Sequence, residues 1–384
     1  MILNSIRHFL LCAFLAALIS GCTVSLPDEI SLSNEEPTAS PATPTALPSP
    51  EPTPTVTTKP VTCADEALTC VGLVTDIGQL TDRSFNQSAW EGAQRAEKDL
   101  LVKIDYVETV SVADYAENID YFVQKEYDII ITVGFGLSEA TLEAAVENPD
   151  IHFIGVDQFQ ASTLENVAGL IFPENEAGFL AGVLAAMVTK TDTIGAVLGP
   201  EAIPPIVAFK EGYELGAYAV NPEIIVLHEY HPGPIDIAFG DELWGANQAR
   251  TMMDAGADVI FAAAGNTGTG ALLEVANDDS SFCIGVDTDQ WLVIPEARPC
   301  LMTSAKKEIQ TGVFELISWS ILGDFRSGNF VGDVSLADFH DFDAQIPSTA
   351  KNLLKDLAFS LANDTIEVDG SYTITNPPSV DLSR

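Results

Sequence analysis

Ten short apolar segments, rich in β-branched residues, recur along this chain. Many of them are separated by amphipathic stretches in which apolar residues repeat with the period of an α-helix. Strands that alternate with helices over such a length predict an α/β fold, with parallel sheets covered by helices on both faces. The expected strands are Cys70–Thr75, Ile104–Val107, Ile129–Val133, Phe153–Val156, Val167–Phe172, Ile194–Leu198, Ile224–Leu227, Val259–Ala263, Phe282–Val286 and Leu301–Ser304. The segment 63–384 is longer than one hydrophobic core usually serves, so we expect two lobes.

The ends of these strands carry glycines and carboxylates. In an open parallel sheet, a ligand binds in the crevice beyond the carboxyl ends of the strands. Glycine lets the backbone turn there, and a carboxylate can face the ligand. The strand ends in question are Thr75-Asp76-Ile77-Gly78, Gly134-Phe135-Gly136, Gly155-Val156-Asp157, Gly265-Asn266-Thr267-Gly268 and Val286-Asp287-Thr288-Asp289.

A helix is expected to begin just after the first strand end. Ser84, followed three residues later by Gln87, matches a capping box, which predicts a helix start at Ser84. Phe85 and Asn86 then lie on the first turn, where a ring can stack on a flat ligand and an amide can hydrogen-bond to it. The alternative is that Phe85 belongs to the core, because it shares one helix face with Ala89, Ala93 and Ala96.

The N-terminal residues have the pattern of an export signal. One basic residue, Arg7, precedes an apolar run from Phe9 to Ile19. This run is too short to span a bilayer, which takes about 20 residues, so we interpret residues 1–21 as a cleaved signal peptide. It ends in Ile19-Ser20-Gly21-Cys22, which resembles the bacterial lipobox, and Cys22 is therefore the expected lipid anchor on the extracytoplasmic face of the cell membrane. The alternative is an ordinary buried cysteine after a secretory signal.

Residues 22–62 are dominated by Pro, Thr, Ser, Ala and Glu. Such a composition cannot bury a core, and proline-rich chain favours extended polyproline II with about 3.1 Å per residue. We therefore expect a lipid-anchored linker that could hold the folded part up to about 120 Å from the membrane. No functional site is expected in it.

Four cysteines fall in the folded part: Cys63, Cys70, Cys283 and Cys300. In an oxidising compartment they are disulfide candidates, and the short separations favour pairing Cys63 with Cys70 and Cys283 with Cys300. Four cysteines allow three connectivities, so the sequence alone does not choose. A zinc site is the other alternative, disfavoured because no pair has the Cys-x-x-Cys spacing of a zinc knuckle.

The formal net charge is −39 at pH 7, from 56 acidic and 17 basic residues. Nucleic acid is therefore not an expected partner, because phosphate backbones are held by Lys and Arg. A highly phosphorylated ligand is disfavoured for the same reason. Most of this charge is interpreted as a solvated surface that keeps an exported protein soluble.

No motif of a familiar enzyme class is present. The chain has no nucleophile elbow, no His-Glu-x-x-His helix and no phosphate loop, and its five histidines stand apart from the strand ends. Asp76 and Asp82 superficially resemble the aspartate cluster by which nucleoside hydrolases hold calcium. Calcium takes six to eight oxygen ligands, however, and no third aspartate lies close in the sequence. We expect a binding protein that needs neither metal nor cofactor, with a nucleoside hydrolase as the alternative.

Several motifs, in the same order, resemble the basic membrane lipoprotein family. They are Val71-Gly72-Leu73-Val74-Thr75-Asp76, Asp82-Arg83-Ser84-Phe85-Asn86-Gln87, Gly256-Ala257-Asp258-Val259-Ile260-Phe261, Ala263-Ala264-Gly265-Asn266-Thr267-Gly268 and Ile284-Gly285-Val286-Asp287-Thr288-Asp289-Gln290. Members of that family include purine nucleoside receptors, which are substrate-binding lipoproteins of ABC transporters. The resemblance implies the type I periplasmic-binding-protein fold, with two Rossmann-like lobes joined by a hinge. One lobe would span about 70–172 with a return segment after about 287, and the other about 173–286 with the C-terminal segment.

The resemblance also implies a ligand site and partners. The partners would be a nucleoside and the permease subunits of an ABC importer, whereas a sugar or a signalling molecule is the alternative ligand for this fold. By motif position, the base contacts fall on Asp76, Phe85 and Asn86, and the second stacking ring on Phe239, with Phe209 as another candidate. The ribose contacts fall on Gly265, Asp287 and Lys307. Two residues depart from the family pattern, Asn266 and Trp291.

Overall fold

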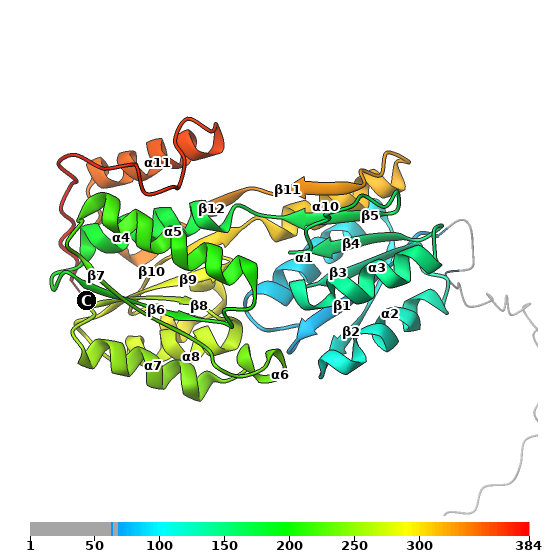
Figure 1. The fold of residues 1–384 in the computed structure, drawn as a ribbon, viewed down its shortest axis with the longest axis horizontal. Coiled ribbons are helices and arrows are strands. Elements are labelled where there is room, and N and C mark those ends of the chain that lie inside the picture. Colours follow the sequence, from blue (N-terminus) through cyan, green and yellow to red (C-terminus); the bar gives the residue numbers. More distant parts are fainter. Residues whose placement is uncertain (1–62, 64–67, 384) are drawn as a thin grey trace, which may run out of the picture. The chain divides into compact units, whose positions relative to one another are not determined.

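The computed structural model describes Cys63 and residues 68–383. The signal peptide predicted for residues 1–21, the anchor Cys22 and the linker 22–62 lie outside the described residues. The described part contains two six-stranded sheets, each covered by helices, as Figure 1 shows. The predicted α/β class with two lobes is confirmed. Within this described part, no helix is long and apolar enough to cross a membrane.

The first lobe is built on a wholly parallel sheet with the strand order β11-β5-β4-β3-β1-β2. Its strands are β1 Cys70–Ile77, β2 Lys103–Thr109, β3 Ile129–Val133, β4 His152–Val156, β5 Val167–Ile171 and β11 Gly328–Val331. Helices α1 Phe85–Leu100 and α10 Ile309–Ile321 cover one face, and α2 Tyr115–Val123 and α3 Ser138–Glu147 cover the other. Two short helical turns complete the lobe, η1 Val112–Asp114 and η2 Phe135–Leu137.

The second lobe repeats this arrangement with the order β12-β10-β9-β8-β6-β7, in which only β12 is antiparallel to its neighbour. Its strands are β6 Thr193–Leu198, β7 Ile225–Tyr230, β8 Val259–Ala263, β9 Phe282–Asp287, β10 Leu301–Lys307 and β12 Val334–Leu336. Helices α4 Glu174–Val188, α5 Pro204–Val220 and α11 Ser348–Ala362 contribute to the core on one face, and α7 Glu242–Asp254 and α8 Gly265–Ala276 to the core on the other. The shorter elements are α6 Ile235–Ala238, α9 Gln290–Val293, η3 Pro295–Ala297 and η4 His340–Phe342.

Helices α4 and α5 pack unusually closely because glycines lie at their contact. A Cβ atom on Gly182 would lie 2.0 Å from the carbonyl oxygen of Tyr213, and one on Gly216 would lie 2.0 Å from that of Phe179. Real Cβ atoms do not approach so closely, so the two backbones can meet only where the side chain is absent. Both helices contribute to the core on one face of the second sheet.

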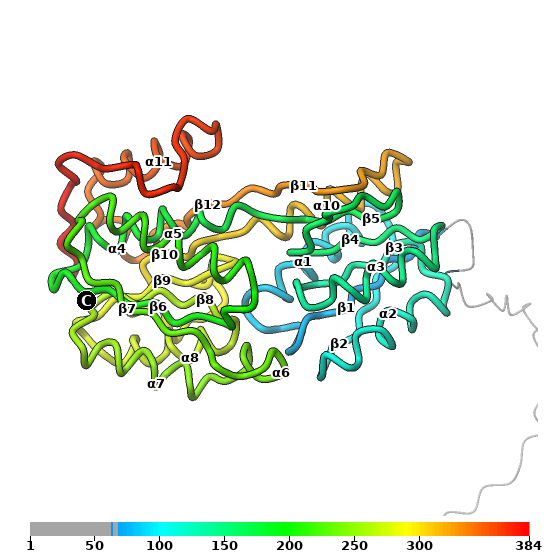
Figure 2. Tube along the Cα trace, in the orientation of Figure 1, coloured from blue at the N-terminus to red at the C-terminus, as the bar shows by residue number. Residues whose placement is uncertain are grey.

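The chain crosses between the lobes three times, at β5–α4, β10–α10 and β11–β12, which can be followed in Figure 2. The chain returns to the first lobe at Ile309, which corrects the boundary expected after about residue 287. The physical reason is that β10 pairs in parallel with β9 and so continues the second sheet. Strands β11 and β12 were not predicted, because each is short and lies at the edge of its sheet.

Both cysteine pairs are disulfide-bonded in the arrangement that the short separations favour. Cys63 is bonded to Cys70 at the start of β1. Cys283 in β9 is bonded to Cys300, which immediately precedes β10. The second disulfide therefore ties together the beginnings of two neighbouring strands, whose opposite ends carry Asp287 and Lys307.

Candidate ligand-binding cleft

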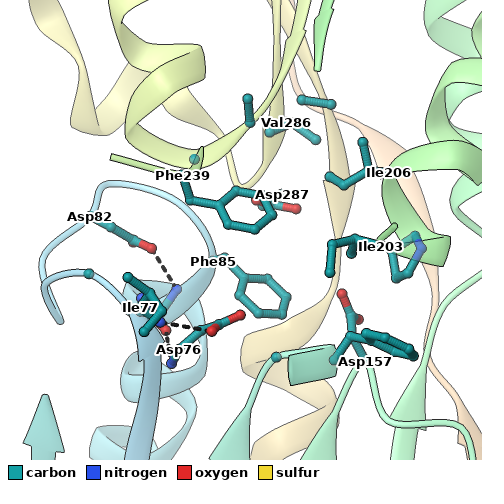
Figure 3. A pocket seen from close by; sticks show the side chains of 18 of the residues that line it. Asp76, Ile77, Asp82, Phe85, Asp157, Ile203, Ile206, Phe239, Val286 and Asp287 are labelled. Carbon is teal, nitrogen blue, oxygen red and sulfur yellow. Dashed lines mark hydrogen bonds between the residues drawn. The ribbon is translucent and has the colours of Figure 1, made fainter. Parts of the chain in front are cut away.

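One cleft gathers the carboxyl ends of strands from both sheets. Side chains at or just beyond the ends of β1, β4, β8 and β9 line it. Figure 3 shows those of β1, β4 and β9 converging from the two lobes. The cleft is lined by all seven residues for which ligand contacts are expected: Asp76, Phe85, Asn86, Phe239, Gly265, Asp287 and Lys307. Their contacts with a ligand stay predictions, whereas their convergence in one cleft is a property of this fold.

Asp76, near the end of β1, presents one carboxylate oxygen to the protein and leaves the other free. Its Oδ1 accepts hydrogen bonds from the hydroxyl of Tyr115 at 2.7 Å and from the backbone N–H of Ile77 at 2.8 Å. Its Oδ2 accepts no hydrogen bond from any described residue. Burial raises the pKa of Asp76 to about 6, although the Tyr115 hydroxyl opposes the rise. Asp76 can therefore serve a ligand as a hydrogen-bond acceptor at one oxygen.

The helix start after β1 is capped by a different residue from the one expected. Asp82 accepts from the backbone N–H groups of Ser84 at 2.9 Å, Asn86 at 2.9 Å and Gln87 at 3.1 Å. The predicted capping box of Ser84 with Gln87 is wrong, because the Ser84 side chain makes no cap bond and Gln87 donates to Glu91 instead. The carboxylate satisfies three amides at once and leaves the serine hydroxyl available elsewhere.

Asn86 is largely occupied by the protein. Its Oδ1 accepts from the backbone N–H of Asp76 at 3.0 Å, and its Nδ2 donates to the carbonyl oxygen of Gln79 at 3.5 Å. The Asn86 side chain is buried at 3% exposure, although it lines the cleft. Its most direct effect is to fix the end of β1 against the start of α1, and so to hold Asp76 in place.

Two aromatic side chains, one from each lobe, point into the cleft in Figure 3: Phe85 at the start of α1 and Phe239 just after α6. Phe85 is half-buried and also packs against the first-lobe core, so its core role and its place in the cleft coexist. Phe239 is held in place through its carbonyl oxygen, which accepts from the backbone N–H of Thr267 at 3.2 Å. Phe209 also lines the cleft but is only 2% exposed, with its ring centroid 6.0 Å from that of Phe261.

Lys307 is the cationic centre of a buried carboxylate cluster. Its Nζ lies 2.5 Å from Asp157 Oδ2 in the first lobe and 3.1 Å from Glu174 Oε1 in the second, and these side chains are at most 8% exposed. Burial alone would lower the pKa of Lys307, but Asp157, Glu174 and Asp287 together raise it above its ordinary value. Burial raises the pKa of Glu174 to about 7, against the opposing attraction of Lys307. Lys307 is therefore charged, and its ion pair with Asp157 of the first lobe crosses the cleft.

The crevice rule placed Asp157 at a strand end, but Asp157 was not among the residues expected to contact the ligand, although a further signal existed. The same four residues, Ile-Gly-Val-Asp, occur at 154–157, where Asp157 directly follows β4, and at 284–287, where Asp287 ends β9. Both aspartates have left-handed backbone conformations, with φ of 59° at Asp157 and 64° at Asp287. Such conformations are uncommon for non-glycine residues and cluster at functional sites. Glu174, which begins α4 beyond the first crossover, carried no comparable signal.

The two residues that depart from the family pattern have different locations. Asn266 lines the cleft next to Gly265. Trp291 does not line it, because its ring stacks on that of His340 at a centroid distance of 4.2 Å, with the Arg298 guanidinium 3.8 Å from the Trp291 ring centroid. Among the described residues, no three His, Cys, Asp or Glu side chains are grouped as a metal site.

The two lobes also bind each other directly at one side of the cleft. The hydroxyl of Ser84 in the first lobe donates to Oδ2 of Asp287 in the second at 2.7 Å. Nearby, Nε2 of Gln290 donates to the carbonyl oxygen of Arg83 at 3.3 Å. These contacts link the beginning of α1 to the end of β9, so the structure describes a closed arrangement of the lobes.

Comparison with known families places this cleft in context. The profile of the family named Bmp, described as ABC transporter substrate-binding protein PnrA-like, matches residues 70–331. The CD4+ T-cell-stimulating antigen of Listeria monocytogenes is 36% identical over 275 residues, which are 67% of this chain and 75% of that protein. The ABC transporter nucleoside-binding protein BmpA of Lactococcus lactis is 34% identical over 276 residues, 67% of this chain and 77% of that protein.

Solved structures agree with these relatives. An ABC transporter solute-binding protein from Aeropyrum pernix superposes with a TM-score of 0.65 and 27% identity, covering 79% of this chain and 88% of that one. The type I periplasmic-binding-protein fold implied by the sequence resemblance is thereby confirmed.

Proposed function

Since this chain belongs to the Bmp family of PnrA-like ABC transporter substrate-binding proteins, we propose that it captures a nucleoside between its two lobes for an ABC importer. A substrate-binding protein of this kind implies a ligand, a permease and an ATPase as partners. The nucleoside is the finer part of the proposal. It is supported by the cleft residues of this chain and by the name of the Lactococcus lactis relative.

The observation that carries the proposal is the pairing of rings and carboxylates in one cleft. Phe85 and Phe239 come from opposite lobes and face the same space, which suits a flat base held between two rings. Asp76 offers a free carboxylate oxygen beside Phe85, which suits a donor on the edge of the base. Asp287 lines the same cleft, and a carboxylate is a suitable acceptor for the two hydroxyls of a ribose.

The cleft suits binding better than chemistry. Both oxygens of Asp82 accept backbone N–H groups, so this residue is occupied as a helix cap rather than offered to calcium. Lys307 forms ion pairs with Asp157 and Glu174, which keep its amine protonated, so this lysine is not available as an uncharged nucleophile. The residues would therefore hold a nucleoside by stacking and hydrogen bonds and release it unchanged to the permease.

Calorimetry with inosine, guanosine and adenosine tests this function. We expect one site per chain, and a negative heat-capacity change, because apolar surface is buried when the lobes close on a base. Ribose or glucose binding at the same site, with no response to nucleosides, would favour the sugar alternative. Free base and ribose appearing on long incubation, measured by chromatography, would instead support the hydrolase alternative.

We propose further that Cys22 carries the lipid that holds the protein on the extracytoplasmic face of the membrane. Support comes from the Ile19-Ser20-Gly21-Cys22 sequence after a short apolar run. In cells fed labelled fatty acid, the wild-type chain should become labelled and the Cys22→Ser variant should not. A labelled, membrane-bound Cys22→Ser variant would contradict the anchor.

A further inference from the structure

Ser84 is a buried hydroxyl whose hydrogen bond crosses the cleft. It is 0% exposed, lies one residue before α1 in the first lobe, and donates to Oδ2 of Asp287 in the second lobe at 2.7 Å. Asp287 is 8% exposed, and its other oxygen, Oδ1, accepts no hydrogen bond from the described part of the chain. Ser84 therefore binds one oxygen of the carboxylate, and the other oxygen remains available to a ligand in the cleft.

The local structure frees Ser84 for this contact. Serine before a helix usually accepts from the backbone amides of its own first turn. Here Asp82 accepts from three of those amides, including that of Ser84 itself, so the hydroxyl is not needed as a cap. The backbone on both sides is held in the left-handed region, with φ of 57° at Arg83 and 64° at Asp287. Conformations of this kind persist only where surrounding contacts maintain them.

Gln290 makes a second cross-cleft contact beside the first. Its Oε1 accepts from the backbone N–H of Val286, the residue before Asp287, at 3.0 Å. Its Nε2 donates to the carbonyl oxygen of Arg83, the residue before Ser84, at 3.3 Å. One buried carboxamide, 1% exposed, thus holds the residues that precede both members of the Ser84–Asp287 pair.

We infer that Ser84 is a positioning residue that orients the Asp287 carboxylate across the closed cleft. Asp287 then binds the ligand's hydroxyls at full strength only when the lobes have closed. This inference rests on the proposed function, because it assigns ligand hydroxyls to Asp287. The carboxylate belongs to the second lobe and its orienting donor to the first, so separating the lobes breaks the bond. Closure and recognition of the ribose are then coupled through one hydrogen bond.

The same helix supplies a matched control. Ser88 is also buried, at 5% exposure, and its hydroxyl donates to the carbonyl oxygen of Ser84 at 2.8 Å, entirely within the first lobe. Ser84→Ala and Ser88→Ala each remove one buried hydroxyl, the first just before α1 and the second in its first turn. Only Ser84→Ala removes a bond between the lobes.

Lobe closure can be measured without any ligand. Spin labels on Glu117→Cys in α2 and Asn247→Cys in α7, both exposed, report the distance between the lobes of the full-length protein. We expect a short-distance population in the unliganded protein. Its ratio to the open population should fall about tenfold in Ser84→Ala, as expected for losing a hydrogen bond to a charged group, and should not change in Ser88→Ala. Equal ratios in both variants, or no short-distance population in the parent protein, would overturn the inference.

Binding supplies the second readout, with inosine and 2′-deoxyinosine as probes. Ser84→Ala should bind inosine about tenfold more weakly and lose most of the preference for inosine over 2′-deoxyinosine, whereas Ser88→Ala should keep that preference. An unchanged preference in Ser84→Ala would overturn the orienting role. If the parent protein bound no nucleoside at all, the proposed function would fail, and so would the claim that Asp287 binds ribose hydroxyls. The distances between the spin labels would still decide whether Ser84 links the lobes.

Discussion

Replacing Lys307 by methionine should destabilise the protein strongly, because it is the cation of a buried charge cluster. Its side chain is 1% exposed, and the carboxylates of Asp157 and Glu174 lie 2.5 Å and 3.1 Å from its Nζ, with 7% and 8% exposure. Removing one partner of a buried ion pair leaves an uncompensated charge, which costs about 3–5 kcal/mol. Lys307→Met should therefore lower the free energy of unfolding at pH 8 by about that amount.

The neighbouring Lys306 provides the control. Its Nζ lies 2.9 Å from Glu308, but the two side chains are 26% and 33% exposed, so Lys306→Met should lower the free energy of unfolding by less than about 1 kcal/mol. Urea denaturation of both variants at pH 5 and pH 8 measures the difference. A loss for Lys307→Met no larger than that for Lys306→Met at pH 8 would refute the cluster's role.

The pH dependence gives this prediction a second check. The pKa of Glu174 in the folded protein is raised to about 7 from an ordinary value of 4.5. A carboxyl group with a raised pKa contributes stability that is present below its unfolded pKa and lost as the pH rises through its folded pKa. Without Lys307 the carboxyl groups can take up protons at pH 5, so the loss should be smaller there than at pH 8. An equal loss at both pH values would contradict the reasoning.

Asp76→Asn should raise the melting temperature relative to the parent protein at pH 8 but not at pH 5. The reason is that the pKa of Asp76 is raised to about 6, and the stability linked to this raised pKa is lost as the pH rises through that value. A difference in melting temperature that does not depend on pH would contradict this. Phe85→Ala should weaken the binding of ribonucleosides and 2′-deoxynucleosides alike by about 1–3 kcal/mol in calorimetry, since a ring reads no hydroxyl. Asp287→Asn should abolish the preference for the ribo form, and an unchanged preference would remove this residue from the ribose site. Replacing both Cys283 and Cys300 by alanine should lower the free energy of unfolding by about 2–4 kcal/mol in urea denaturation, and a change below about 0.5 kcal/mol would show that the disulfide does not restrain the unfolded chain.

The framework of this fold could be predicted because local patterns determine it. All ten expected strands are present, since a short apolar run in the sequence marks each of them. Eight of the ten are mostly buried, whereas β2 and β7, which lie at the edges of their sheets, are not. The crevice rule then selected Asp76 and Asp287 because both stand at strand ends, where parallel sheets of either lobe present their last residues to the cleft. Phe239 was reached through family resemblance rather than through any period in the sequence.

The remaining features depend on contacts between residues distant in the sequence. Ser84 has the local pattern of a helix cap, and only the approach of the second lobe gives its hydroxyl another acceptor. Glu174 joins the site because the crossover after β5 places the start of α4 beside Lys307. The two residues are 133 positions apart in the sequence. The chain returns to the first lobe at Ile309 rather than soon after residue 287 for the same reason. The pairing of β10 with β9 joins residues distant in the sequence, and local patterns do not encode it.

Native mass spectrometry of the full-length protein, purified from its membrane without denaturation, tests most directly whether the cleft holds an intact nucleoside. We expect one bound molecule per chain with the mass of a nucleoside, retained in the parent protein. It should be lost when Phe85 and Phe239, the two rings that line the cleft, are both replaced by alanine. A bound hexose, a free base with ribose, or a nucleoside retained equally by the doubly substituted variant would contradict the account.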